Sequence, residues 1–416
     1  MRVGYLANIY PRASDTYVRE EVAALRRRGH DVRTFAMRSP DPAEVLASGT
    51  AQEQTATHYL VPGYRDEAAD VARWVLRHPS HVVRAASLAA RLRAPGLKGL
   101  VWPWIYLAEA LRLAVRCQRT GVRHVHAHTS EGPAAVAMLG AALSGGSWSM
   151  TVHGPYEWDR APTLHLDLKT ERATHVVAIS EYTRGQLYRW VPPALWDRVH
   201  VVRCGVAPRF VAETATPAEA TAEPGGPVEL LCVGRLAPEK GQRLLVRAVH
   251  EVLASSSAGA GGLRVRLVGD GPDRADLEAL VTSLGLQDVV VLEGWRSGDE
   301  IAQLLRAARA LVLPSLAEGL PIALMESLAV HRPAVVSAVA GVPELLTDGA
   351  NGWLVPPGDP PALAGALQRV LAASPEELAR MGARGAADVR RLHDVDRAAA
   401  ELEVLLLAAG AAPPAP

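Results

Sequence analysis

The residues best suited to chemistry lie in one run of the second half of the chain, VLPSLAEGLPIALMESLA at 312–329. We expect a strand that ends at Pro314, then a loop, then a helix whose first turn is favoured by Pro321. The carboxylate of Glu318 lies in that loop. Glu326 lies about one and a half turns into the helix and, because helical side chains lean toward the N-terminus, reaches back toward the same place.

The same loop has the groups of an anion site. Gly319 lets the backbone approach a ligand closely. The amides of Gly319, Leu320 and the residues after Pro321 point along the positive end of the helix dipole, an arrangement that suits a diphosphate. Because two carboxylates would repel phosphates, Glu318 and Glu326 suit hydroxyl groups, one of a sugar and the other of a ribose. The alternative for Glu326 is an ordinary surface position on the helix.

Two cations occur in VGRLAPEKG at 233–241. A strand ends near Gly234, and Arg235 and Lys240 flank a turn that contains Pro238, so both emerge at the carboxyl edge of a parallel sheet. Arginine offers a bidentate fork and lysine a point charge for phosphate oxygens. Such cations can neutralise a leaving diphosphate without a metal. The alternative is a pair of solvated basic residues in a loop.

Two further strand ends belong to the same expected edge. The glycines of VGDGP at 268–272 suit close packing, and Gly269 is also placed with the groups that bind the ligand. The run VVLEGW at 290–295 ends another strand, where Gly294 and Trp295 could frame a nucleotide base.

Histidines mark strand ends in the first half. His153, in MTVHGPYEWD, ends a strand and could bind a reacting sugar or an acceptor; the alternative is a structural histidine that caps a loop. In HVHAH, His124, His126 and His128 alternate and share one face. Without a carboxylate partner, three such histidines favour packing and hydrogen bonding, so we expect no metal.

These groups must be positioned by two successive patterns of short strands and longer helices, typical of parallel sheets with crossover helices. In the first half we expect the strands Arg2–Ala7, Asp31–Met37, Val122–His128, Ser147–His153, Thr174–Ser180 and His200–Cys204. In the second half we expect Val228–Gly234, Arg264–Gly269, Val289–Glu293, Ala310–Pro314, Ala334–Ala338 and Trp353–Val355. Ligands bind beyond the carboxyl ends of such strands.

A chain of 416 residues is too long for one hydrophobic core, so two domains are expected. The expected divisions are a first domain at 1–210 with a helical insertion at about 64–120, a linker at 211–227, a second domain at 228–392, a helix at 393–410 that packs back toward the first domain, and a tail at 411–416.

Composition excludes several classes of protein. Lys and Arg together number 44, as do Asp and Glu, so there is no basic excess for nucleic acid. The three scattered cysteines indicate a reducing compartment. No signal peptide or membrane span is expected, which places the protein in the cytosol or, at most, on a membrane surface. The insertion is basic and contains tryptophan, so it either packs inward or contacts an anionic membrane.

Taken together, the second half resembles glycosyltransferase family 4, the retaining transferases of the GT-B fold. The motifs are GRLAPEKG, VGDGP, the pair Glu318 and Glu326, and AGVPELLTDGANGWLVPPGD at 340–359, in the family's order. The first half is a looser match through PRASDTYVREEVAAL, HVHAH, TVHGP and AISEYTR, and is similar to the colanic-acid and exopolysaccharide type.

The resemblance implies an α/β fold of two Rossmann-like doubly wound domains facing across a cleft. It implies that Glu318 contacts the transferred sugar, Glu326 the ribose hydroxyls, and Arg235 and Lys240 the diphosphate. His153 then faces the reacting sugar.

On the acceptor side the resemblance implies His128 and His153, with Ser14, Asp15 and Thr16. The last three stand where many family members have a Gly-Gly loop. Tyr156 and Glu157 follow the His-Gly pair where relatives often carry an Asp.

The function we expect is retaining, metal-independent transfer of a hexose from a UDP- or GDP-sugar to a saccharide or polyprenyl-diphosphate-linked acceptor, in exopolysaccharide or glycoconjugate biosynthesis. The nucleotide sugar is a co-substrate, and no other cofactor is expected. The alternatives are a nucleotide-sugar 2-epimerase on the same fold and a non-catalytic scaffold that binds sugar nucleotides.

Overall fold

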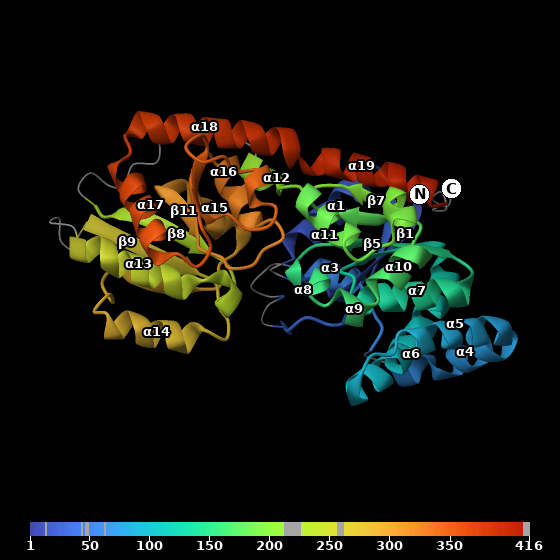
Figure 1. Cartoon of the computed structure of the whole chain (residues 1–416). Coiled ribbons are helices and arrows are strands. Elements are labelled where there is room, and N and C mark those ends of the chain that lie inside the picture. Colours follow the sequence, from blue (N-terminus) through green and yellow to red (C-terminus); the bar gives the residue numbers. More distant parts are fainter. Residues whose placement is uncertain are drawn as a thin grey trace. The chain divides into compact units, whose positions relative to one another are not determined.

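The computed structural model describes residues 1–12, 15–42, 45, 50–61, 64–211, 226–255 and 262–410. The chain divides into two units, Met1–Gly205 with Val395–Pro416, and Val206–Asp394 (Figure 1). Most of the expected linker and the whole of the expected tail lie outside the described residues. Each unit contains its own parallel sheet with helices packed on it.

The first unit has a seven-stranded sheet in the order β3-β2-β1-β4-β5-β6-β7, with every pair parallel. All six strands expected in the first half are present, and the short β3 at the sheet edge was not predicted. The strands are β1 Arg2–Ile9, β2 Asp31–Arg38, β3 His58–Tyr59, β4 His124–His128, β5 Ser147–Val152, β6 Val176–Ala178 and β7 Val199–Val201.

Helices connect these strands and cover the sheet. They are α1 Thr16–Arg27, α3 Ala51–Ala56, α4 Tyr64–Arg77, α5 Pro79–Arg91, α6 Gly96–Thr120, α7 Gly132–Ser144, α8 Pro155–Trp158, α9 Ala161–Leu164, α10 Leu166–Arg172, α11 Glu181–Tyr188, the 3-10 turn η1 Pro193–Arg198, and α19 Val395–Ala408.

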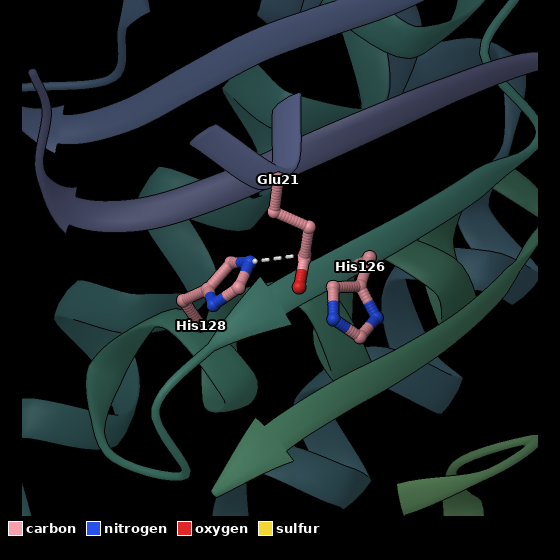
Figure 2. A group of neighbouring side chains, drawn as sticks. All are labelled: Glu21, His126 and His128. Carbon is pink, nitrogen blue, oxygen red and sulfur yellow. Dashed lines mark ion pairs between the residues drawn. The ribbon is translucent and has the colours of Figure 1, made fainter. Parts of the chain in front are cut away.

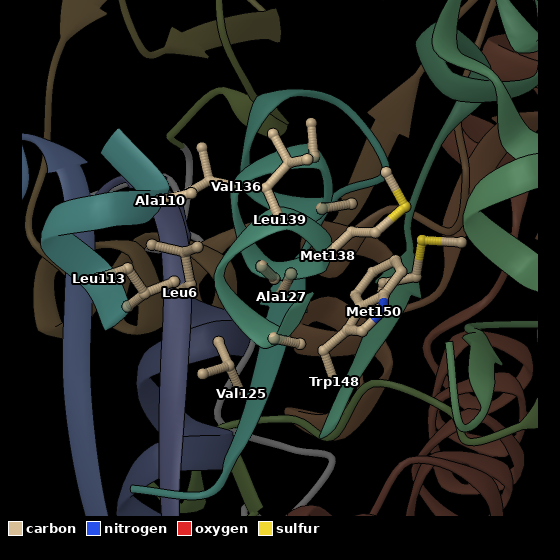
Figure 3. Packing of buried hydrophobic residues seen from close by; sticks show 14 of the residues in the cluster. Leu6, Ala110, Leu113, Val125, Ala127, Val136, Met138, Leu139, Trp148 and Met150 are labelled. Carbon is tan, nitrogen blue, oxygen red and sulfur yellow. The ribbon is translucent and has the colours of Figure 1, made fainter. Parts of the chain in front are cut away.

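The core of the first unit forms around α7. This helix is apolar on every side because it packs between the sheet and α6, and nearly all of its side chains are buried. Leu113 of α6, Leu139 of α7 and Leu6 of β1 belong to one cluster (Figure 3). Burial of a leucine of this kind stabilises the fold by roughly 1.5–3 kcal/mol.

The helices α4, α5 and α6 occupy the segment expected to be a helical insertion. Helix α6 continues through Pro103, which cannot donate to the carbonyl of Gly99 one turn earlier. That carbonyl instead accepts a hydrogen bond from the amide of Ala94 at 3.2 Å. The charged face of α6 is held by a buried ion pair between Arg112 and Glu67, whose Nε and Oε2 atoms are 2.7 Å apart.

The start of α6 presents apolar side chains to solvent. Between residues 71 and 108 the chain contains no Asp or Glu. The exposed large apolar residues recur at helical spacing, on one face of α6: Leu97, Leu100, Val101, Trp104 and Ile105. The basic residues of the same stretch are Arg73, Arg77, Arg84, Arg91, Arg93 and Lys98.

The last helix that the structure describes is α19, which packs against α1 within the first unit. Leu402 and Leu406 of α19 share a buried cluster with Leu25 of α1. His30 lies 2.7 Å from Glu403 through its Nε2 atom.

The second unit has a six-stranded parallel sheet in the order β10-β9-β8-β11-β12-β13. All six strands expected there are present. They are β8 Val228–Val233, β9 Leu263–Val268, β10 Val290–Gly294, β11 Ala310–Leu313, β12 Ala334–Ser337 and β13 Gly352–Val355. The helices are α12 Pro208–Val211, η3 Pro238–Lys240, α13 Gln242–Ser255, α14 Arg274–Ser283, α15 Gly298–Ala307, α16 Ile322–Ala329, η5 Val342–Glu344, α17 Pro360–Ala372 and α18 Pro375–Leu392.

Among the helices that the structure describes, none combines the length and the apolar character needed to cross a bilayer.

Candidate functional site

In the second unit, the loops after β8 and β11 are joined at the carboxyl edge of the sheet. Gly241 has a φ of +67°, and a Cβ at this position would lie 2.1 Å from the carbonyl oxygen of Pro314. The carbonyl of Glu239 accepts a hydrogen bond from the amide of Leu316 at 2.8 Å. A glycine is therefore required where the two loops touch, and the contact brings Lys240 to the loop that carries Glu318.

Lys240 and Glu318 form an ion pair. The Nζ atom lies 2.7 Å from Oε1 and 2.9 Å from Oε2, and the hydroxyl of Ser315 donates to Oε1 at 2.7 Å. The side chain of Glu318 is 8% exposed and that of Lys240 is 28% exposed. The carboxylate is thus fixed from two sides, whereas the lysine side chain is partly exposed.

Arg235 lies on the same loop and pairs with a different carboxylate. Its Nη2 atom is 2.7 Å from Oε1 of Glu239, and half of its side chain is exposed. Its backbone carbonyl accepts a hydrogen bond from the side chain of Gln242 at 2.9 Å. The backbone at Arg235 is fixed, while the exposed guanidinium can change partner.

Helix α16 starts at Ile322, four residues after Glu318. Pro321 is the residue that caps the helix, so the helix begins at Ile322, one residue later than expected. The carbonyl of Gly319 accepts a hydrogen bond from the amide of Gly341 at 3.0 Å, which fixes the loop before the helix. Leu320 and Glu326 are buried. The first amides of a helix have no partner within it, so this end can receive an anion.

Gly269 holds two loops together. Its φ is +131°, and a Cβ there would lie 2.1 Å from the carbonyl oxygen of Gly234. Its amide donates to the carbonyl of Gly294 at 2.8 Å. Trp295 follows, and half of its surface is exposed. The glycines pack the strand ends tightly and leave the indole ring at the surface.

In the first unit, the histidines of β4 form a hydrogen-bonded ladder with β5. Both ring nitrogens of His124 form hydrogen bonds at 2.8 Å, one with Ser147 and one with Ser149. Those of His126 form hydrogen bonds of the same length with Ser149 and Thr151. Burial lowers the pKa of His124 to about 3, and it holds the pKa of His126 far below its usual value. These rings are therefore neutral.

The contact at one end of this ladder fixes which atom donates in each of its hydrogen bonds. The hydroxyl of Ser147 donates to the carbonyl of Ala409 at 3.0 Å, so its oxygen must accept from Nδ1 of His124. Nε2 of His124 then accepts from Ser149, which accepts from Nδ1 of His126. Nε2 of His126 is left to accept from Thr151.

His128 belongs to a different set of contacts. Its Nδ1 atom lies 3.0 Å from Nε2 of His153, and its Nε2 atom lies 3.3 Å from Oε1 of Glu21 (Figure 2). Tyr5 donates its hydroxyl to the same oxygen of Glu21 at 2.8 Å. The ring of Tyr17 lies 4.6 Å from that of His153, centroid to centroid. His153, the residue after β5, is thereby contacted by side chains of two elements, β4 and α1.

Glu21, His126 and His128 have ligand atoms within 4.8 Å of one another, which is the spacing of a candidate metal site. The carboxylate that the sequence argument did not find is supplied by α1. Both nitrogens of His126, however, are already engaged with hydroxyl groups. A metal would have to break one of these bonds, so the group fits a hydrogen-bonded network better than a metal site.

Two buried ionisable side chains, Glu157 and Lys169, contact the backbone of the loops after β4 and β5. Glu157 accepts the amide hydrogens of His153 at 2.6 Å and of Gly154 at 3.1 Å, and also that of Ser130. Lys169 donates to the carbonyls of Ser130 and Glu131. Burial raises the pKa of Glu157 and lowers that of Lys169 to about 7. Glu157 therefore fixes the backbone at His153.

The remaining acceptor-side residues lie near the start of α1. Ser14 is outside the described residues. Asp15 precedes α1 and its carbonyl accepts the amide of Val18 at 3.2 Å, while Thr16 is the first residue of the helix.

Sequence reasoning missed several groups that the structure brings to the predicted residues. Ser315 and Glu239 are partners of Glu318 and Arg235, and both lie within the quoted runs. Glu21 had a signal of its own, since it occupies the apolar stripe of α1 formed by Val18, Val22 and Leu25.

Two family models match the chain. The one described as "Glycosyl transferases group 1" matches residues 227–373, and the one described as "Glycosyltransferase Family 4" matches residues 14–210. A Salmonella typhimurium protein named as a colanic acid biosynthesis glycosyltransferase, WcaL, is 27% identical over 88% of this chain and 90% of its own length. Alpha-D-kanosaminyltransferase of Streptomyces kanamyceticus is 30% identical over 66% of this chain and 75% of its own length.

Solved structures share the architecture. Anabaena HepE in complex with UDP aligns with a TM-score of 0.71 over 98% of this chain and 100% of that chain, at 16% identity. Sucrose-phosphate synthase from Thermosynechococcus elongatus aligns with a TM-score of 0.72 over 98% of this chain and 99% of that chain, at 20% identity.

Proposed function

Since this chain belongs to the family 4 glycosyltransferases and has the GT-B fold, we propose that it transfers a hexose from a UDP- or GDP-sugar to a saccharide acceptor, with retention of anomeric configuration. The observation that carries the proposal is the pair of Lys240 and Glu318 at the carboxyl edge of the second sheet. The solved Anabaena HepE complex with UDP-glucose, which has the same fold, supports a nucleotide-sugar donor.

In this proposal Lys240 binds the donor diphosphate without leaving Glu318. An ammonium group has three donors, and two of its hydrogen bonds go to Glu318. The third is available for a phosphate oxygen. Oε1 of Glu318 already accepts from Lys240 and Ser315, whereas Oε2 accepts from Lys240 alone, so Oε2 has the capacity to accept a hydroxyl of the transferred sugar.

Arg235 binds the diphosphate by exchanging Glu239 for phosphate. The exchange is plausible energetically because exposed ion pairs contribute only about 0–1 kcal/mol, while guanidinium–phosphate bonds are charge-assisted and bidentate. The opening amides of α16 face the same anion, Glu326 takes the ribose hydroxyls, and Gly294 with Trp295 frames the base. Gly269 holds the loop after β8 and the end of β10 close together through its contacts with Gly234 and Gly294.

These cations and amides would stabilise the charge that develops on the departing diphosphate, so the reaction we propose needs no metal. In a front-face reaction the leaving phosphate oxygen takes the proton of the acceptor hydroxyl, the bond from the sugar to the diphosphate breaks, and the new glycosidic bond forms on the same face. No separate carboxylate base is then required. In this proposal His153 lies beside the reacting sugar, and the acceptor side includes His128, Asp15 and Thr16.

We propose a lipid-linked or free saccharide as acceptor, in exopolysaccharide or glycoconjugate biosynthesis. Support comes from the relatives, because the WcaL protein of Salmonella typhimurium is named for colanic acid biosynthesis. An Erwinia amylovora relative, AmsK, is named for amylovoran biosynthesis and is 36% identical over 35% of this chain. Nucleic acid is not a proposed partner.

A polyprenyl-diphosphate carrier would place the enzyme in the cytoplasm, at the inner face of the membrane. The exposed apolar face of α6, which includes Leu97 and Trp104, lies in a stretch of six basic and no acidic residues. Such a face suits the surface of an anionic bilayer. We expect flotation with vesicles that contain phosphatidylglycerol, loss of flotation in Trp104→Glu, and no loss in Val404→Glu, a matched change on the exposed side of α19.

The test of the proposed function is product analysis with UDP- and GDP-hexoses, chosen by thermal shift, with and without saccharide acceptors. A glycoside that forms only when acceptor is present supports the transferase. An epimerised sugar nucleotide without acceptor would indicate the 2-epimerase instead. Binding without any turnover would indicate a non-catalytic scaffold.

A further inference from the structure

A buried path of polar groups leads from α1 to His153. It runs from Tyr5 to Glu21, from Glu21 to His128 and from His128 to His153, over distances of 2.8, 3.3 and 3.0 Å. We propose that Glu21 and His128 are positioning residues that fix the proton of His153 on Nε2 and keep its Nδ1 as an acceptor. The proposal rests on the proposed role of His153 beside the reacting sugar.

The path begins at a group whose direction is known. The hydroxyl of Tyr5 donates to Oε1 of Glu21, so this oxygen acts as an acceptor. Burial beside Glu21 keeps the pKa of Tyr5 well above its usual value, and the hydroxyl therefore retains its proton. Any further group that faces Oε1 is stabilised only if it also presents a hydrogen.

His128 is that further group. Its Nε2 atom is buried, and its contact with Oε1 of Glu21 at 3.3 Å has the distance of an ion pair. Among the described residues this nitrogen has no hydrogen-bond partner. Figure 2 shows the ring on β4 facing the carboxylate of α1. If Nε2 lacked its proton, two lone pairs would face each other in a buried site, which is costly. A single proton on this ring is therefore carried by Nε2, and Nδ1 is then bare.

The bare Nδ1 of His128 decides the state of His153. It lies 3.0 Å from Nε2 of His153, so it accepts from that nitrogen. Burial and the neighbouring His128 hold the pKa of His153 well below its usual value, so its ring is neutral and carries one proton. With this proton on Nε2, Nδ1 of His153 presents a lone pair to a substrate hydroxyl.

The histidine ladder on the same strands gives an internal contrast. The carbonyl of Ala409 fixes Ser147 as a donor, which places the protons of His124 and His126 on Nδ1. The strands β4 and β5 and the residue after β5 thus carry two pairs of histidines, to which the contacts assign opposite tautomers. A spectrum that resolves tautomers tests both assignments at once.

The competing interpretation of Glu21 and His128 is a metal site completed by His126. It requires His126 to give up a hydroxyl partner, whereas the path to His153 breaks no hydrogen bond. The two interpretations differ in metal content. One equivalent of zinc in the purified protein, lost in Glu21→Leu, would overturn the proposal.

The experiment is long-range proton–nitrogen NMR on protein labelled with ¹⁵N-histidine, with His153→Asn to assign the signal of His153. Wild type should show His153 almost entirely as the Nε2–H tautomer. Glu21→Leu removes the acceptor and should yield a mixture of tautomers, while Glu21→Gln keeps an acceptor oxygen and should retain Nε2–H. An unchanged His153 signal in Glu21→Leu would overturn the proposal.

Turnover gives the second measurement. We expect kcat to fall about tenfold in Glu21→Leu, with the donor KM within about twofold, and recovery in Glu21→Gln. Unchanged signals of His124 and His126 verify that the sheet is intact. Equal losses in kcat and in those signals would indicate a structural role and overturn the proposal. Because the NMR measurement needs no substrate, it tests the path even if the proposed transfer fails.

Discussion

The two units place polar groups at strand ends by different means. In the second unit, Lys240 and Glu318 meet because Gly241 lets two loops touch, and both residues belong to short runs of sequence. In the first unit, Glu21, His128 and His153 meet inside the sheet and its covering helix, over more than a hundred residues of chain. A loop-built site can be recognised from local sequence, whereas a core-built site requires the tertiary fold.

The polar groups of the two regions also differ in charge and exposure. Lys240 and Arg235 are partly exposed ions paired with carboxylates, and such groups can exchange partners when an anion arrives. The first unit instead relies on neutral rings, because burial lowers the pKa values of His124, His126 and His153. The second region is suited to charge stabilisation and the first to directional hydrogen bonding.

The largest expected effect comes from Lys240→Ala, which removes the charge that defines the second region. We predict a loss of transfer of about a thousandfold, corresponding to about 4 kcal/mol of transition-state stabilisation. Product formation with the UDP- or GDP-hexose is measured, and circular dichroism checks the fold. Lys98→Ala, an exposed lysine of α6, is the control. Near-normal activity of Lys240→Ala with an intact fold would refute its role.

A slightly smaller effect is expected from Gly269→Ala, which tests whether glycine contacts build the loop site. The new Cβ would lie 2.1 Å from the carbonyl oxygen of Gly234 at a φ of +131°. We predict a loss of about 3 kcal/mol in the free energy of unfolding, measured with urea. Gly365→Ala, in a helix with open space around it, should stabilise by up to about 1 kcal/mol. Equal stabilities of the two variants would contradict the packing role.

The core-built region is tested by His153→Ala. Because we place this ring beside the reacting sugar and away from the diphosphate, kcat should fall about 10- to 100-fold. Donor affinity, measured by calorimetry, should change by less than about threefold. A change confined to donor binding would count against the position beside the reacting carbon.

The smallest effect concerns a buried carboxyl of the first unit. Glu109 has both oxygens buried without a hydrogen-bond partner among the described residues, and burial raises its pKa to about 7. The folded protein therefore keeps a proton that the unfolded chain releases above its ordinary pKa near 4.5. Keeping this proton adds to the free energy of unfolding. The addition is fully present at low pH and is lost as the pH rises through about 7.

We predict that Glu109→Gln removes this pH dependence and stabilises the protein by about 1 kcal/mol at pH 8. Urea unfolding of wild type and variant at pH 5, 6, 7 and 8 is the measurement. Parallel profiles for the two proteins would show that Glu109 does not carry the effect.

The sequence was sufficient to locate the strands because hydrophobic runs and their bounding glycines are local signals. All twelve expected strands are present, with ends that differ by at most three residues. The two-residue strand β3, His58–Tyr59, was missed because so short a strand has no periodicity to read. Family membership was recognised from motifs of the second half and is confirmed by the family models.

The contacts within the sites were harder to predict. Placing Arg235 and Lys240 on one loop was possible from spacing, but their separate carboxylate partners, Glu239 and Glu318, depend on side-chain packing. The link from Glu21 to His153 could not be read, since it depends on the register of β4 with β5 and on the position of α1. The sequence signal for such a link is a carboxylate within the apolar stripe of a helix, as Glu21 is in α1.

Calorimetric titration of UDP and GDP, each compared with its nucleoside monophosphate, tests most directly that Lys240, Arg235 and the start of α16 grip two linked phosphates. Wild type should bind the diphosphate more tightly than the monophosphate. Lys240→Ala should lose about tenfold or more of this preference, while its affinity for the monophosphate changes little. Equal affinity of wild type and Lys240→Ala for the diphosphate would contradict this prediction.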